Sequence, residues 1–243
     1  MEITEKTVVL TGGTSGIGRC LVERLQPSNR LFVLARDRTR LAALAQDIPG
    51  LEIIEVDLAD RVALGAAVET IARRADSVDL LINNAAVQYT PTVLDAAFDV
   101  DAIEREVAVN FTAVCQLKVM LLPLLQHSDA GTIVNVNSGL ALAPKTTSAV
   151  YCATKSAMDS FSQSLRYQLE ATPVSVLQAF LPLVDTPMTE GRGRGKMTAV
   201  DAADRILLGI ERRTVTNDIG KTKLLRALLT VAPPLARRIM KQS

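Results

Sequence analysis

The order in which apolar segments follow one another constrains the fold of this chain more than any other feature of its sequence. Six short runs rich in Val, Ile and Leu indicate β-strands: TVVL (7–10), LFVLA (31–35), LEIIEV (51–56), DLLIN (79–83), TIVNVN (132–137) and VSVLQAF (174–180). The runs are continuous rather than alternating, as in strands whose two faces are both covered. Segments with helical spacing separate them. This order predicts an α/β fold, a single doubly wound Rossmann-type domain in which a parallel sheet of six to seven strands carries helices on both faces.

We expect residues 1–243 to form one domain, because no repeat, low-complexity tract or linker interrupts the alternation before about residue 185. After the sixth run, DTPMTEGRGRGK contains three glycines and predicts a loop or lid near 185–200. The remaining segment, 201–243, is expected to be helical and carries basic residues among leucines near its end. Such a helix can pack its leucines on the body or lie on a membrane surface. The first arrangement is the commoner one, so membrane association is not expected.

Composition excludes several classes of protein. Lysine plus arginine (27) nearly balance aspartate plus glutamate (26), so no net charge favours nucleic acid as a partner. Three scattered cysteines, Cys20, Cys115 and Cys152, are too few for a disulfide framework or a zinc site, and no metal site is expected. The N-terminus lacks a basic region followed by a long apolar one, and no apolar run reaches about 18 residues. These features predict a soluble, cytoplasmic protein.

The first strand runs into a glycine-rich turn, TGGTSGIGRCLVERL, with glycines at 12, 13, 16 and 18. Such a turn lets backbone N–H groups approach a pyrophosphate, and the helix that follows supplies partial positive charge at its N-terminus. The spacing differs from the G-x-G-x-x-G dinucleotide fingerprint. A tight strand-to-helix turn without a ligand remains the alternative.

A tyrosine and a lysine stand four residues apart in YCATKSAMDSF (151–161), at the start of a predicted amphipathic helix. This spacing places Tyr151 and Lys155 on one helical face, where an ammonium can influence the acidity of a phenol. Alone, the pair is more often a packed ring beside a solvated charge. The only histidine, His127, is expected to cap a helix end, which leaves a Ser-His-Asp hydrolase without support.

Together with the glycine turn, NNAA (83–86), Asn110 and Ser138, this pair makes the chain resemble the short-chain dehydrogenase/reductase family from about residue 6 to 188. The resemblance implies a nicotinamide cofactor and hydride transfer between it and a carbonyl or alcohol carbon of a small molecule. It implies the catalytic residues Asn110, Ser138, Tyr151 and Lys155. The cofactor-binding residues that we expect are Gly12, Thr14, Ser15, Gly16, Ile17, Gly18, Arg36, Asp57, Leu58, Asn84, Ala85, Tyr151, Lys155, Val184 and Thr186.

Each implied catalytic residue has a chemical role. Tyr151 is the acid/base, because negative charge builds on the substrate oxygen during hydride transfer and a proton must be delivered there. The ammonium of Lys155 and the positive nicotinamide both favour phenolate and are expected to lower the pKa of Tyr151. By the resemblance, Lys155 also holds the nicotinamide ribose and Asn110 supports a relay water. Ser138 can hydrogen-bond the substrate oxygen.

Cofactor choice depends on the residues just beyond the second strand. If the strand ends at Ala35, the next residue is Arg36, whose guanidinium can bind the 2′-phosphate of NADP. If the end is misplaced by one residue, the carboxylate of Asp37 lies at the ribose and favours NAD. The positive local charge favours NADP(H) over NAD(H).

The sequence departs from the family pattern in three places. NNAA stands where NNAG is common, Pro182-Leu183 replaces Pro-Gly after the sixth strand, and the VDGG-like final strand is absent. The family also implies a homodimer or homotetramer built on the helices near 103–125 and 151–171. A cofactor-binding scaffold without turnover is the alternative function, although a scaffold has no chemical need for all four catalytic residues.

Overall fold

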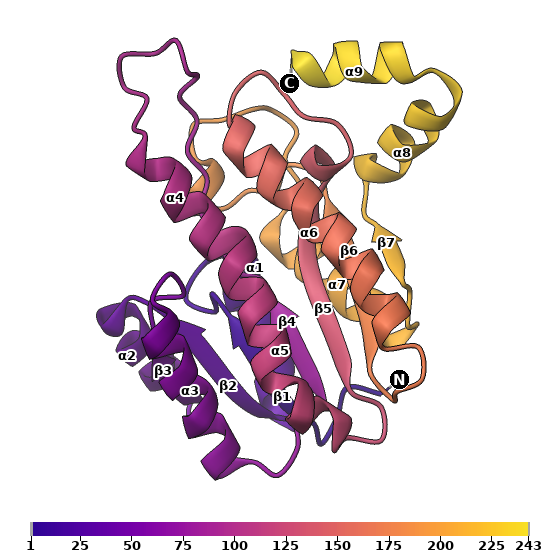
Figure 1. The fold of residues 1–243 in the computed structure, drawn as a ribbon. Helices are drawn as coiled ribbons and strands as arrows, with labels where there is room; N and C mark the ends of the chain where they lie inside the picture. Colours follow the sequence, from indigo (N-terminus) through magenta and orange to yellow (C-terminus); the bar gives the residue numbers. More distant parts are fainter. Residues whose placement is uncertain (1, 243) are drawn as a thin grey trace.

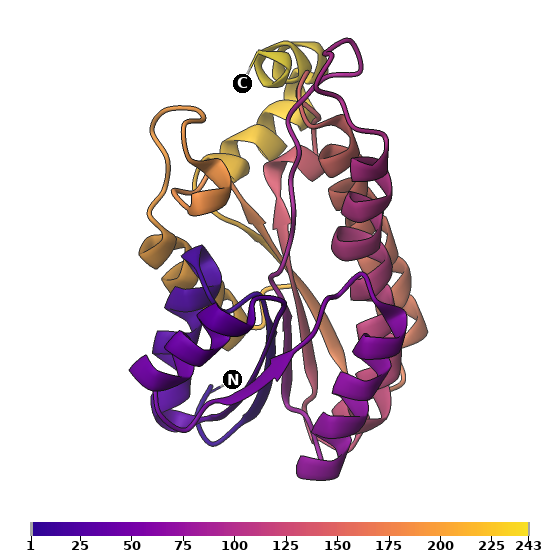
Figure 2. The ribbon, with the colours of Figure 1, turned by 90° about the vertical axis from the view of Figure 1, so that its left-hand side faces the viewer.

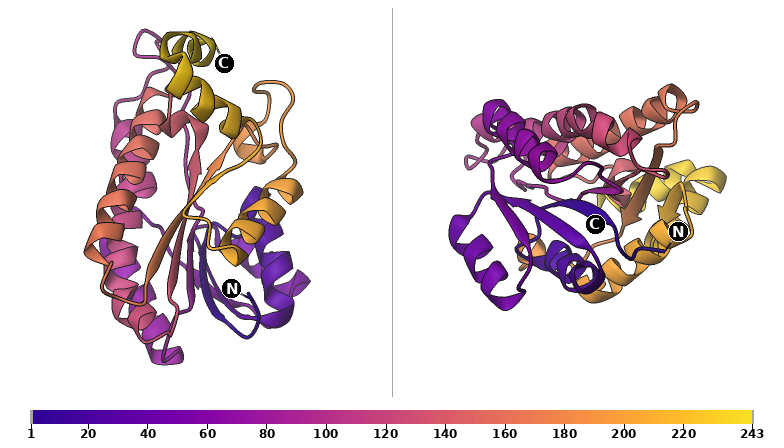
Figure 3. Two further views of the ribbon diagram at one scale, coloured as in Figure 1. Left: turned by 90° about the vertical axis from the view of Figure 1, so that its right-hand side faces the viewer. Right: turned by 90° about the horizontal axis from the view of Figure 1, so that it is seen from below.

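The computed structural model describes residues 2–242. Seven parallel strands form one sheet in the order β3-β2-β1-β4-β5-β6-β7, with helices on both faces (Figures 1 and 3). The strands are β1 Thr7–Thr11, β2 Arg30–Ala35, β3 Glu52–Glu55, β4 Leu80–Asn83, β5 Thr132–Ser138, β6 Ser175–Leu181 and β7 Thr216–Asp218. The predicted doubly wound α/β fold is confirmed. The segment that lacks the family's usual final-strand sequence nevertheless forms β7, which pairs with β6.

Helices α1 to α7 lie between the strands as the alternation predicts, and α8 and α9 follow β7. They are α1 Gly16–Leu25, α2 Arg38–Asp47, α3 Arg61–Arg74, α4 Asp101–Val107, α5 Ala113–Gln126, α6 Ala149–Gln168, α7 Ala199–Glu211, α8 Lys221–Val231 and α9 Pro233–Lys241. Three single turns of 3-10 helix are η1 Gln26–Ser28, η3 Gly139–Ala141 and η4 Pro187–Thr189, and one wide π-helical turn is η2 Ala108–Thr112. His127 is the C-cap of α5, as expected.

Two apolar cores lie on opposite faces of the sheet (Figure 2). In β1, Val8 and Leu10 face α1, α2 and α7, whereas Val9 faces α3 and α5. Side chains of a strand alternate between faces, so a strand covered on both sides must be apolar at every position. This is the physical reason for the continuous apolar runs.

The longest helix passes from α4 through η2 into α5 without a break, from Asp101 to Gln126. Its length and composition would suffice for a membrane span. Leu117, Leu121 and Leu125 are fully or almost fully buried in the core that this helix shares with the sheet. Packing against the sheet therefore accounts for these leucines on one side of the helix.

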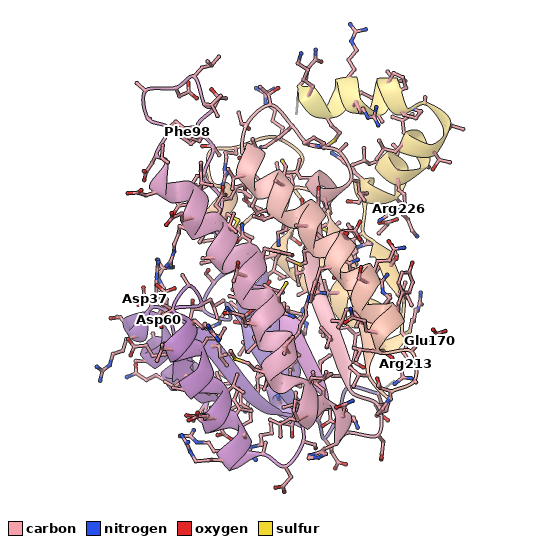
Figure 4. All side chains as sticks on the ribbon, in the orientation of Figure 1. Asp37, Asp60, Phe98, Glu170, Arg213 and Arg226 are labelled. Atoms are coloured by element: carbon pink, nitrogen blue, oxygen red, sulfur yellow. The ribbon has the colours of Figure 1, made fainter. Side chains whose placement is uncertain are left out.

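The C-terminal helices α8 and α9 lie beyond the end of the sheet, above β7 in Figure 1. The leucines here pack on the body only in part: Leu225 lies against Gly139 and is half-buried, whereas Leu224 is 71% exposed and Leu235 is 51% exposed. The segment is also held by Arg226 (labelled in Figure 4), whose guanidinium binds both carboxylate oxygens of Asp218 and stacks 4.7 Å from the Phe180 ring centroid.

Candidate active site

The glycine turn after β1 is shaped by close backbone approach. Gly12 has φ +74°, and a Cβ built there would lie 2.8 Å from the Cα of Ala85. A Cβ on Gly18 would lie 1.9 Å from the carbonyl oxygen of Gly12. No side chain can enter either position without moving backbone, so the turn keeps its N–H groups accessible at the start of α1.

The predicted pyrophosphate-binding residues share this location. The N-cap residue Ser15 makes no side-chain capping hydrogen bond, so the first N–H groups of α1 are left uncapped. Thr14, Ser15 and Ile17 are half-buried beside them. We call the glycine turn from Gly12 to Gly18 the glycine cradle. An uncapped helix N-terminus beside it fits a phosphate group.

Asn84, which directly follows β4, ties the end of that strand to the glycine turn. Its side-chain amide donates to the carbonyl oxygens of Thr11, at 3.1 Å, and Gly12, at 3.0 Å. The hydroxyl of Thr11 in turn accepts from the N–H groups of Asn84 and Ala85, both at 3.1 Å. The NNAA motif therefore holds the glycine turn in place. Contact of Asn84 with a ribose stays a prediction.

The end of β2 lies where the sequence analysis placed it, at Ala35. Arg36 follows, exposed, with no ion-pair or hydrogen-bond partner for its guanidinium within residues 2–242. The carboxylate of Asp37 accepts a hydrogen bond from the N–H of Arg40 at 3.0 Å and caps α2 (Asp37 is labelled in Figure 4). Its capping role leaves Arg36 as the free charged group after the strand.

Asp57, expected beside the adenine, lies after β3 in an ion pair with Arg105 of α4 at 2.9 Å. Burial alone would raise the pKa of this carboxyl, but hydrogen bonds from Arg105 and from the N–H of Ala59, with the charge of Arg36, bring the pKa below its ordinary value. Leu58 next to it is buried. The carboxylate is thus held ionised at the edge of the predicted adenine site.

Ser138, Tyr151 and Lys155 come together at the carboxyl ends of the strands. Ser138 is the last residue of β5, and Tyr151 lies in the first turn of α6. The ammonium of Lys155 lies 5.6 Å from the centroid of the Tyr151 ring and donates to the carbonyl oxygen of Val136 at 3.0 Å. Both side chains are buried. The structure therefore assembles the three residues that the resemblance put together.

The pKa of Tyr151 differs from the sequence-based expectation. Burial raises the pKa of the phenol well above its ordinary value, and the charges of Cys152 and Glu106 act in the same direction. The Ser138 hydroxyl, as a hydrogen-bond partner, and Arg192 lower it by less. Burial also lowers the pKa of the Lys155 ammonium, to about 8. The phenol is therefore held in its protonated form.

Asn110 lies in the wide turn η2 and is completely buried. Its side-chain oxygen accepts from the N–H of Val87 at 2.8 Å, and its amide donates to the carbonyl oxygen of Val87 at 2.8 Å and to the Thr154 hydroxyl at 3.3 Å. It thus joins the segment after β4 to α6, one residue before Lys155. The relay water stays a prediction.

The lid loop, residues 185–198, follows β6 and is closed at its base. Val184 pairs with Met197 in an isolated parallel bridge, and Lys196 binds both the carboxylate of Asp185, at 3.2 Å, and the carbonyl oxygen of Thr189, at 2.7 Å. Thr186 reaches the glycine turn: a Cβ built on Gly16 would lie 2.9 Å from its methyl group. Of the two cofactor-binding residues expected here, Thr186 therefore lies at the glycine turn, and Val184 lies at the base of the loop.

Two charged residues that act on Tyr151, Glu106 and Arg192, escaped the sequence analysis. Glu106 of α4 is buried, accepts from the N–H of Tyr89 at 2.9 Å, and has its carboxyl pKa raised by burial. Arg192 of the lid loop interacts electrostatically with Tyr151 and with Lys145, which precedes α6. These residues come from different elements and have no common motif. The only sequence signal was the run of basic residues in GRGRGK.

Comparison with known proteins agrees with this geometry. The sequence profile described as short chain dehydrogenase matches residues 6–196. An uncharacterised oxidoreductase, DltE of Bacillus subtilis, is 35% identical over 191 residues, covering 78% of this chain and 76% of that protein.

Two solved structures share the fold over almost their whole length. A short-chain dehydrogenase from Sphingobium yanoikuyae in complex with NADPH is 28% identical with a TM-score of 0.81 and covers 94% of each chain. A short-chain dehydrogenase/reductase from Burkholderia phymatum in complex with NAD is 21% identical with a TM-score of 0.85 and covers 98% of this chain and 97% of that one. On its sequence match, its fold and its Ser-Tyr-Lys arrangement, this chain belongs to the short-chain dehydrogenase/reductase family of oxidoreductases.

Proposed function

We propose that this oxidoreductase uses NADP(H) to interconvert a carbonyl group and an alcohol on a small molecule, with Tyr151 as acid/base. The observation that carries the proposal is the buried Tyr151 phenol, with the Ser138 hydroxyl and the Lys155 ammonium beside it. The glycine cradle between Gly12 and Gly18 accommodates the cofactor's pyrophosphate because no side chain occupies it.

The bound nicotinamide supplies or accepts the hydride at the reacting carbon. In the direction of reduction, the substrate oxygen gains the proton of the Tyr151 hydroxyl, so that one hydride and one proton convert the carbonyl to an alcohol. Burial keeps this phenol protonated at neutral pH, ready to donate. Ser138 donates a hydrogen bond to the same oxygen as charge develops. Lys155, with a pKa of about 8, can exchange protons near neutrality and favours the return of the phenol to its protonated form.

The catalytic assignment is tested with Tyr151→Phe, which removes only the phenolic oxygen. A panel of neutral ketones and aldehydes is screened with NADPH and NADH by the loss of nicotinamide absorbance. Tyr151→Phe should abolish turnover of any accepted substrate while NADPH affinity stays within several-fold, since only the proton donor is removed. Near-normal kcat in Tyr151→Phe would contradict the role of Tyr151. A wild-type protein that binds NADPH and reduces none of the panel would favour the scaffold alternative.

The preference for NADP(H) rests on the contrast between Arg36 and Asp37. The guanidinium of Arg36 is exposed and unpartnered within residues 2–242, whereas the Asp37 carboxylate is engaged in capping α2. An arginine free to form charge-assisted hydrogen bonds suits a 2′-phosphate. A carboxylate that caps a helix is less available to the ribose hydroxyls of NAD.

Titration with NADPH and NADH tests this preference. We expect NADPH to bind at least about tenfold more tightly, and Arg36→Ala to remove about that factor for NADPH and leave NADH unchanged. Arg38→Ala is the matched control, because Arg38 is exposed nearby and lies 3.9 Å from Glu55. Affinity for NADH that equals or exceeds that for NADPH, with no effect of Arg36→Ala, would refute the preference.

A further inference from the structure

Helix α8 carries apolar side chains on the side that faces away from the body. Leu224 is 71% exposed, Val231 is 81% exposed, and Leu228 between them is half-buried. At about 100° per residue, these three positions lie within about 60° of one another around the helix. Thr222, on the opposite side, is buried. We call Leu224, Leu228 and Val231 the outer stripe of α8.

Helix α9 adds exposed apolar surface next to α8. Leu235 and Ile239, one turn apart, are each 51% exposed. On the neighbouring side of α9, Ala236 is buried and Met240 is half-buried. The body therefore covers only part of the apolar side of α9. Figures 1 and 3 show both helices at the end of the molecule, beyond the sheet.

The same segment carries only positive charge. Residues 220–242 include six basic residues and no acidic one. Arg226 is paired with Asp218. The other five are exposed, and none has a carboxylate within ion-pair distance in residues 2–242. They are Lys221, Lys223, Arg237, Arg238 and Lys241.

Three of these cations border the exposed apolar residues. Around α8, Lys221 and Lys223 lie on the two sides of the outer stripe. Around α9, Arg238 lies about 60° from Leu235. Each helix therefore presents apolar side chains with positive charge directly beside them, which is the pattern of a helix that lies in a membrane interface.

The two helices are held to the body at both ends. At the start of α8, a Cβ built on Gly139 would lie 3.4 Å from Leu225 and 3.5 Å from the Thr222 hydroxyl. At the end of α9, the Thr146 hydroxyl donates to the carbonyl oxygen of Lys241 at 2.7 Å. The exposed side chains therefore belong to a fixed part of the fold.

The charge of this surface decides between possible occupants. In a two-fold contact with a second copy, the same surface of each chain meets, so the five unpaired cations would face five more. Nucleic acid supplies phosphates but no apolar surface to cover Leu224 and Val231. A bilayer that contains anionic lipids supplies both negative headgroups and acyl chains.

We propose that α8 and α9 bind the surface of an anionic membrane, with the outer stripe of α8 and Leu235 and Ile239 of α9 among the upper parts of the acyl chains. The long side chains beside them reach the headgroup phosphates. The sequence alone favours leucines that pack on the body, and with them no membrane association; the exposure of Leu224 and Leu235 changes that expectation. The inference does not depend on the proposed function.

A single tryptophan reports whether the outer stripe enters a bilayer, because the chain contains none. Val231→Trp places the reporter in the stripe, and Val62→Trp of α3 is the matched control, since Val62 is 83% exposed. The vesicles are phosphatidylcholine alone or with about one third phosphatidylglycerol. At about 0.1 M salt, we expect the emission of Val231→Trp to shift to the blue with the mixed vesicles only, and that of Val62→Trp to stay unchanged.

Sedimentation with the mixed vesicles assigns the binding to apolar side chains. Leu224→Gln combined with Leu235→Gln removes one exposed leucine from each helix and should weaken partitioning at least about tenfold. Both positions are exposed, so the variant should keep the far-UV circular dichroism and urea midpoint of the wild type. Val62→Gln is its control and should partition as the wild type does.

A second pair of substitutions measures the contribution of charge. Lys221→Gln combined with Lys223→Gln should also weaken partitioning at least about tenfold, because each lysine near an anionic surface contributes to binding. Arg61→Gln combined with Arg73→Gln is the matched control, since both arginines are exposed on α3. Partitioning of the wild type should fall when the salt is raised to about 1 M.

The inference is overturned if the wild type binds the mixed vesicles no more tightly than phosphatidylcholine alone. It is also overturned if partitioning survives in either the leucine or the lysine variant. A wild-type protein that does not bind vesicles but loses an assembly in the leucine variant, by light scattering, would show instead that this surface joins copies of the chain. The proposed function is assayed without vesicles, so these outcomes leave it unaffected.

Discussion

Lys118 of α5 is a charged side chain that the fold holds in its core, and replacing it should stabilise the protein. It is 1% exposed, and its ammonium has no hydrogen-bond partner within residues 2–242. The nearest favourable contact is the Phe161 ring, 4.9 Å away. Burial lowers the pKa of this lysine from 10.5 to about 8. We therefore choose Lys118→Met, which keeps an unbranched side chain only one heavy atom shorter and removes the charge.

The magnitude follows from the shift in pKa. A change of about 2.5 units corresponds to about 3 kcal/mol, at roughly 1.4 kcal/mol per unit. The lysine is protonated in both folded and unfolded chains below pH 8, so the destabilisation is complete there and declines as pH rises toward 10.5. Loss of the contact with Phe161 removes about 1 kcal/mol of stabilisation. We expect Lys118→Met to be more stable by about 2 kcal/mol at pH 7 and by clearly less at pH 9.5.

Urea unfolding followed by far-UV circular dichroism at several pH values measures this difference, at one protein concentration and one ionic strength. Lys223→Met is the matched control, because Lys223 of α8 is exposed and should show little change. The charge of Lys118 also lowers the pKa of Lys155, so the variant should raise that pKa. A Lys118→Met protein that is less stable at pH 7, or whose gain does not vary with pH, would refute the reasoning.

Three further predictions concern the cradle, the wide turn and the assembly. Gly18→Ala should reduce NADPH affinity at least about a hundredfold in a titration, because its Cβ would lie 1.9 Å from the Gly12 oxygen; Gly65→Ala, with nothing within 4 Å of its Cβ, should bind normally. Asn110→Ala should lower the free energy of unfolding by about 2–3 kcal/mol, since it leaves the N–H and carbonyl of Val87 without partners, and an unchanged urea midpoint would count against this. Light scattering should show a dimer or tetramer, because the long helix exposes apolar surface: Val119 of α5 is 62% exposed, and Phe111, which contacts Phe161, is partly exposed; a single 26.1 kDa species at micromolar concentration would exclude this assembly.

The sequence predicted best the features that depend on local chemistry. The six apolar runs became strands within one or two residues of their expected bounds, because each run must cover two faces of the sheet. The end of β2 at Ala35 was also predicted, and with it the position of Arg36. The candidate catalytic residues were predicted from a family pattern.

The features that the sequence could not predict depend on distant parts of the chain meeting in space. One example is which side of a helix faces the sheet: Leu117 and Leu165 are buried there, and helical spacing alone does not single them out. Another is the pKa of Tyr151, where burial outweighs the neighbouring ammonium.

The wide turn η2 lets the side chains before it and those after it point in directions that a regular α-helix could not combine. A regular α-helix advances by about 100° per residue, so one extra residue in a turn rotates everything after it by that amount relative to everything before it. Upstream, Glu106 is directed at the N–H of Tyr89; downstream, Leu117 and Leu121 face the sheet. Deleting one residue between 108 and 112 would make the helix regular. Glu106 and the two leucines could then no longer both face their present neighbours, because one set would be rotated by about 100°. The rotation of this helix about its axis therefore helps to shape the candidate active site. We expect an insertion or deletion in η2 to destabilise the protein far more than a substitution there.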